Sequence, residues 1–151
     1  MMNNVLLIDT DNISAYYTIE ALSRFKGLNV MTANNLADAY DLVTKIPFLV
    51  VIYHAMIEIN NQESFVEKTQ PYTIENGTRF FIYYGDHNPD LFKKFNYESL
   101  TRVNIFGQAI DINLLVNKIA EIVKTKNGPK KYSMMLILLI PSSNHQFLRL
   151  R

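Results

Sequence analysis

The sequence contains no cysteine, and only five of its 151 residues are glycine. The lack of cysteine excludes disulfides, thiol catalysis and zinc sites with cysteine ligands. It also fits a reducing compartment, and we expect a cytoplasmic protein. Neither a Walker pattern nor a dinucleotide glycine fingerprint occurs, so a nucleotide-binding loop is not expected. We therefore expect no cofactor.

The chain also lacks an excess of either charge, because it has 15 basic and 14 acidic residues. Direct nucleic-acid binding is not expected, since it needs a clustered basic face. No segment reaches the roughly 18 apolar residues of a membrane span. The start, MMNNVLLIDTDN, has no basic region, and its apolar run is broken at Asp9. We therefore do not expect a signal peptide.

What the sequence does contain is an alternation of apolar runs with helix-patterned segments. The length and a hydrophobic content of 48% predict one globular domain with a short appendage. Short apolar runs bounded by polar residues read as buried strands. They lie at residues 5–8, 28–33, 48–53, 79–84 and 103–106. The unbroken run at 48–53 predicts a central strand buried on both faces.

A helical pattern follows each strand. The first helix is expected to begin after Asp11 or Asn12, to end at Gly27, and to bury the face listed here: Ile13, Tyr17, Ala21 and Phe25. Asn35 is expected to cap the second helix and Asp111 the last. Between them we expect a short helix at 63–68 that ends before Pro71, a loop at 69–77, and a short helix opening at Asn88.

Five strand–helix repeats predict an α/β fold with a parallel sheet and helices on both faces. In such a sheet, binding sites form beyond the carboxyl ends of the strands. Those ends carry Asp9-Thr10-Asp11, Tyr53-His54, Tyr84-Gly85-Asp86-His87 and Phe106-Gly107-Gln108.

Four segments carry a resemblance to a known family: VLLIDTDN, PFLVVIYHAM, FFIYYG and IFGQAIDINLLVNKI. In order and spacing, residues 3–125 resemble the receiver domain of two-component response regulators. The resemblance implies a flavodoxin-like, doubly wound five-stranded sheet with strand order 2-1-3-4-5. It also implies a signalling role through protein contacts.

The departures from the family pattern fall on its phosphorylation chemistry. Under this resemblance, Tyr53 stands at the phospho-accepting aspartate, and Thr10 replaces the acid that would follow Asp9. Tyr84, or Tyr83 with a shift of one residue, stands at the hydroxyl position, and Gln108 stands at the lysine. Aspartyl phosphorylation needs a carboxylate nucleophile and a magnesium ion with oxygen ligands. The sequence therefore predicts a degenerate receiver, without enzymatic activity, that acts independently of phosphorylation.

Several interpretations stay open. Tyr53 and Tyr84 either fill the phosphate pocket and hold one conformation, or only pack with hydroxyls at the wet strand ends. Asp9 is either a remnant metal ligand or a loop cap. The alternative function is a small α/β enzyme or metal-binding protein that uses Asp9, His54 and His87 at the strand ends.

The last part of the chain is expected to be separate from the receiver-like domain at 1–125. Residues 126–151 are predicted to be a linker, centred on Gly128-Pro129, and an apolar tail that includes 134–140. The tail is an extra strand, the start of a second domain, or a segment that docks on a partner. The resemblance implies signalling partners or a homodimer through the fourth helix, fifth strand and fifth helix.

Overall fold

The computed structural model describes residues 3–84, 94–97, 100, 102–106 and 111–139, with the side chains of 12–14 and 126–139 excepted. The chain divides into two compact units, residues 1–112 and 113–151, which we describe separately.

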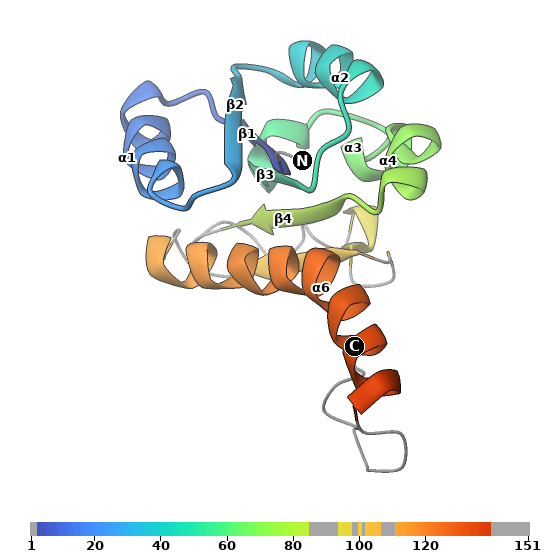
Figure 1. Ribbon diagram of the computed structural model, residues 1–151. Coiled ribbons are helices and arrows are strands. Elements are labelled where there is room, and N and C mark those ends of the chain that lie inside the picture. The colour runs from blue at the N-terminus through green and yellow to red at the C-terminus, as the bar shows by residue number, and fades with distance from the viewer. Residues whose placement is uncertain (1–2, 85–93, 98–99, 101, 107–110, 140–151) are drawn as a thin grey trace. The chain divides into compact units, whose positions relative to one another are not determined.

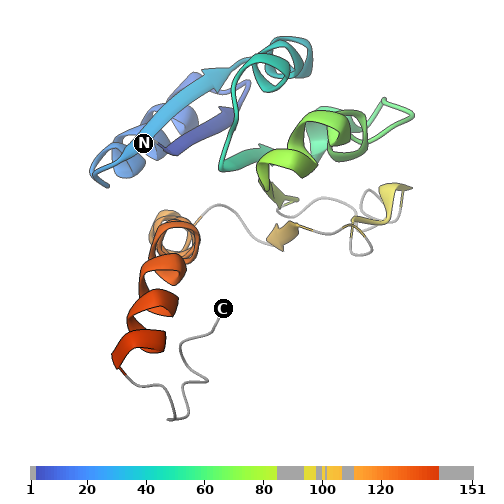
Figure 2. The ribbon, with the colours of Figure 1, turned by 45° about the vertical axis from the view of Figure 1, so that its right-hand side comes forward.

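A five-stranded parallel sheet organises the first unit (Figure 1). Its strands are β1 (Asn3–Ile8), β2 (Leu28–Ala33), β3 (Val50–His54), β4 (Arg79–Tyr83) and β5 (Val103–Phe106). Their order in the sheet is β2-β1-β3-β4-β5, with β1 beside β2, as Figure 2 shows. The predicted fold class and strand order are confirmed.

The centre of the sheet is β3, which pairs with β1 on one side and β4 on the other. Residues 48–53 are all buried, as the unbroken apolar run predicts. Because side chains alternate between the faces of a strand, Val51 and Tyr53 share one face. They join a core cluster with Leu6, Phe80 and Ile82 and with residues of the helices that follow β2 and β3.

The first helix, α1 (Asn12–Ser23), buries a different face from the predicted one. Among its described side chains, which do not include Ile13, the buried ones are Ala15, Thr18 and Leu22, whereas Tyr17 is 59% exposed. The prediction was wrong because it placed the large ring inside and the threonine outside. A tyrosine has a polar tip and tolerates the surface. The helix ends before Gly27, whose φ of 91° is in the left-handed region that glycine favours.

The second helix, α2 (Leu36–Lys45), begins as predicted. The Asn35 side chain accepts a hydrogen bond from the amide of Asp38 at 2.8 Å, which caps the helix.

The connection after β3 is more helical than expected. It contains a 3₁₀ turn η1 (Ala55–Glu58), then α3 (Phe65–Lys68) and α4 (Gln70–Asn76). The loop predicted at 69–77 is therefore wrong. Pro71 lies in the first turn of α4, where its missing amide costs nothing because that amide has no helical partner.

The second unit contains nearly all of α6 (Ile112–Leu139). The helix runs through Gly128 and Pro129, where a linker was expected, while the division of the chain at residue 125 stays a prediction. Of the helices described, none is long and apolar enough to cross a membrane.

Candidate functional site

The carboxyl end of β3 places Tyr53 inside the protein, with only 1% of the residue exposed. Its ring meets the ring of Phe65 edge-on, with centroids 5.9 Å apart. Its hydroxyl donates a 2.6 Å hydrogen bond to Oε1 of Glu58. The expectation of a hydroxyl at a wet strand end is therefore wrong for Tyr53, because a buried carboxylate takes the place of water.

Glu58 ends the 3₁₀ turn after β3 and is fully buried. Oε1 also accepts a hydrogen bond from the hydroxyl of Tyr97. Oε2 accepts one at 2.6 Å from the backbone amide of Phe65, the first residue of α3. An ionised carboxylate is an acceptor only, so these donors match it. We call Glu58, Tyr53, Tyr97 and the Phe65 amide the Glu58 cluster.

The pKa values within this cluster follow from its burial. Burial raises the pKa of Glu58, while the hydrogen bonds from the two phenols and the Phe65 amide, and the charge of Lys94, offset part of the rise. Burial first, and then the charge of Glu58, raise the pKa of Tyr53 and of Tyr97 well above that of a free phenol. Both phenols are therefore protonated at neutral pH and remain donors.

A raised pKa at Glu58 predicts a pH dependence of stability. The folded protein binds this proton more tightly than the unfolded chain, so the contribution is present at low pH and is lost as pH rises through the folded pKa. The unfolding free energy of the wild type minus that of Glu58→Gln should fall from pH 4.5 towards neutrality, by at most about 1.4 kcal/mol per pH unit. Urea titrations at several pH values measure this. A difference that rises with pH would mean that the donors outweigh burial.

Asp9 and Thr10 follow β1 at the same edge of the sheet. The Asp9 carboxylate accepts a 2.7 Å hydrogen bond from the amide of Asp11, as the loop-cap alternative predicts. The Thr10 side chain is exposed. Among the described residues, no group of three or more histidine, aspartate or glutamate side chains could hold a metal ion.

The other predicted site residues are distributed as follows. His54 caps the 3₁₀ turn, because its Nδ1 accepts a 3.1 Å hydrogen bond from the amide of Met56. Tyr84 is half-buried and packs against the same core cluster as Tyr53. His87 and Gln108 lie outside the described residues, so the enzyme or metal alternative built on Asp9, His54 and His87 stays a prediction.

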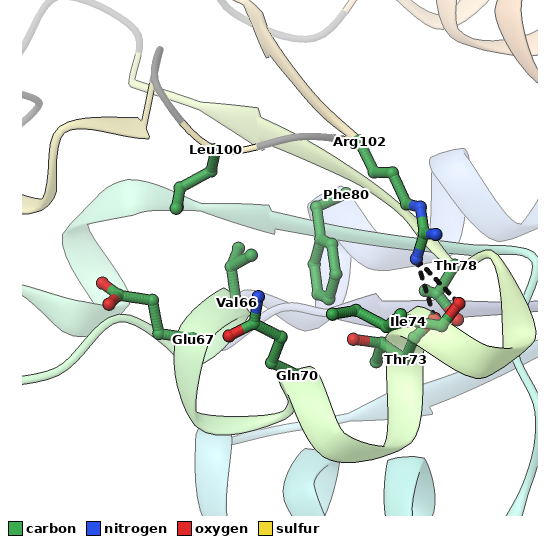
Figure 3. A pocket seen from close by; sticks show the side chains of 9 residues that line it. All are labelled: Val66, Glu67, Gln70, Thr73, Ile74, Thr78, Phe80, Leu100 and Arg102. Carbon is green, nitrogen blue, oxygen red and sulfur yellow. Dashed lines mark hydrogen bonds between the residues drawn. The ribbon is translucent and has the colours of Figure 1, made fainter.

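A separate surface pocket lies between α4 and the edge of the sheet, and none of its lining residues belongs to the predicted site (Figure 3). Val66 and Phe80 are among its apolar lining residues. The guanidinium of Arg102 donates to the carbonyls of Thr73 and Ile74, at 3.4 and 2.9 Å, near the end of α4. Arg102 therefore stabilises a helix end.

No protein-family model matches the sequence, and no curated protein matches it significantly. Solved structures do match. A two-component response regulator from Clostridium difficile aligns with a TM-score of 0.66 at 13% identity, over 84% of this chain and 100% of that one. The fold is that of a receiver domain.

Two further receiver structures agree. A CheY-like response regulator receiver domain protein from Methanospirillum hungatei JF-1 gives a TM-score of 0.62 at 15% identity, over 80% of this chain and 93% of that one. The chemotaxis protein CheY4 of Vibrio cholerae gives 0.63 at 16% identity, over 81% and 99%. At such identities the likeness establishes the receiver fold, while function has to be argued from the residues.

Proposed function

We propose that this chain is a signalling domain of the receiver type that acts through protein–protein contact and accepts no phosphoryl group. The observation that carries the proposal is the state of Tyr53. Its hydroxyl is buried and hydrogen-bonded to Glu58 at the strand end where the resemblance places the phospho-accepting aspartate.

Tyr53 is a poor nucleophile for two reasons. Burial first, and then the charge of Glu58, raise the pKa of the phenol, so Tyr53 keeps its proton at neutral pH, and a protonated phenol is a weak nucleophile. The hydroxyl is also enclosed, so a phosphoryl donor cannot approach it in line without opening the core.

The surroundings of Tyr53 offer little to a magnesium ion. Magnesium is usually bound through one or two carboxylates together with phosphate oxygens and water. Asp9 has no acidic neighbour at position 10, and one of its oxygens accepts the Asp11 amide. Glu58 is fully buried with both oxygens hydrogen-bonded. Within the part of the chain that the structure describes, metal-assisted phosphoryl transfer therefore lacks its usual set of ligands.

Incubation with acetyl phosphate and Mg²⁺, followed by intact-mass measurement, tests the proposal. We expect no gain of a phosphoryl mass. A receiver domain that carries the acidic pair and the aspartate, treated in parallel, controls for the activity of the reagent. A stoichiometric gain that is lost in Tyr53→Phe would contradict the proposal.

The nature of the partner is a proposal as well. The resemblance points to signalling proteins or a second copy through the fourth helix, fifth strand and fifth helix. Among the described strands, β5 pairs with β4 and stands last in the order of the sheet. An edge strand can accept another strand, which fits a role in binding.

A further inference from the structure

We propose that Glu58 is a built-in anion that fastens the connection after β3 to the segment after β4, so that this edge of the domain holds one conformation without phosphorylation. The regulatory part of this inference rests on the proposed function. Its physical basis is the Glu58 cluster.

One carboxylate holds three points of the chain, which lie 5, 7 and 39 residues from it in sequence. Tyr53 is the last residue but one of β3, Phe65 begins α3, and Tyr97 lies in the segment 94–97 that precedes β5. Tyr97 is 39 residues from Glu58 and only 1% exposed. Because all three donors meet one side chain, neither segment can move away without breaking a charge-assisted hydrogen bond inside the core.

A second contact joins the same two segments. The ammonium group of Lys94 donates a 2.7 Å hydrogen bond to the carbonyl of Ile59, one residue after Glu58. The Phe95 and Tyr97 rings pack against each other at 5.7 Å between centroids. The segment 94–97 is therefore tied to the turn after β3 at both of its ends.

The regulatory role that we infer depends on where the Glu58 cluster and the Lys94–Ile59 hydrogen bond lie in the fold. β3 and β4 are neighbours in the sheet, and their carboxyl ends lie at the edge where a doubly wound fold places its sites. A reversible ligand at that edge would bias two arrangements of the connections that follow these strands. Glu58 supplies a carboxylate that belongs to the chain itself at this place, which removes the need for such a ligand.

Amide hydrogen exchange of the full chain tests the inference. Glu58→Gln keeps the size of the side chain but removes its charge and replaces one acceptor oxygen by a donor. Amides of 55–66 and 94–97 should exchange at least tenfold faster than in the wild type, and those of β1 and β2 should change less than twofold. Glu67→Gln is the matched control, since this exposed carboxylate on α3 accepts a 3.2 Å hydrogen bond from the Ser64 hydroxyl and lies outside the Glu58 cluster.

Tyr97→Phe is a second, milder variant that removes one hydroxyl. We expect faster exchange at 94–97 and little change at the Phe65 amide, whose bond to Oε2 is kept. Uniform acceleration over the sheet, or no acceleration at all, in either variant would overturn the inference. The exchange rates and the phosphorylation assay are independent measurements. Failure of the inference about the Glu58 cluster can therefore be told apart from failure of the proposed function.

Discussion

Tyr53→Asp, the substitution that restores the family's acceptor residue, is expected to destabilise the domain by roughly 4 kcal/mol or more without making it a phosphoryl acceptor. Removing a buried aromatic ring costs roughly 3–5 kcal/mol, and an added buried carboxylate costs more. The new carboxylate would lie near Glu58, and two like charges in one dry site raise each other's pKa. Thr10 would still stand where the family has the acid after Asp9, so the acidic pair that holds magnesium would stay incomplete.

Urea unfolding followed by circular dichroism measures the first part of this prediction, and intact mass after acetyl phosphate treatment measures the second. Tyr53→Phe is the matched control. It keeps the ring in the core and removes the hydroxyl that donates to Glu58, for which we expect a loss of about 1–2 kcal/mol. A Tyr53→Asp variant that is as stable as the wild type and takes up a phosphoryl group would show that the site is intact apart from one residue.

Glu58→Ala should destabilise the domain by roughly 3–5 kcal/mol at neutral pH. It leaves two buried hydroxyls and the Phe65 amide without their acceptor, and each unpaired buried donor costs about 1–3 kcal/mol. Water entering the vacated space would recover part of this loss. The predicted effect is a large share of the total stability of a domain, so unfolding should be followed from low urea concentrations at reduced temperature.

Glu67→Ala provides the comparison for Glu58→Ala. Glu67 is an exposed carboxylate nine residues further along the chain, and its loss should change the unfolding free energy by about 0.5 kcal/mol or less. Equal effects of the two substitutions would contradict the account, because burial and three donors would then make no difference.

The sheet was predictable because its strands are marked by composition. Buried parallel strands need apolar residues on both faces, and the run at 48–53 is apolar throughout and follows Pro47. The Asn35 cap was predictable for the same reason, since a short polar side chain before an apolar stripe has a local bond to make.

Two local errors have physical causes. Pro71 was taken as a stop signal, although proline is also favoured in the first turn of a helix. The buried face of α1 was predicted wrongly because Tyr17 was placed inside for the size of its ring, although its polar hydroxyl lets it stay exposed. Sequence periodicity alone could not decide between these options.

The Glu58 cluster could not be found from the sequence. Glu58 is an isolated acid between Ile57 and Ile59, which is a weak sign of burial. Nothing in the sequence links it to Tyr97, because that contact depends on how the crossover connections pack. Tyr53 was identified through the resemblance, but its partner became visible only in the folded chain.

Titration of the ¹⁵N-labelled chain with Mg²⁺ and then beryllofluoride, followed through the amide signals of Asp9, Tyr53 and Ala55, tests the central claim most directly. If a phenol anchored on Glu58 has replaced the phosphoryl acceptor, these signals should stay where they are at every concentration. Saturable shifts centred on Tyr53 would contradict the account, because they would reveal a working metal and phosphate pocket.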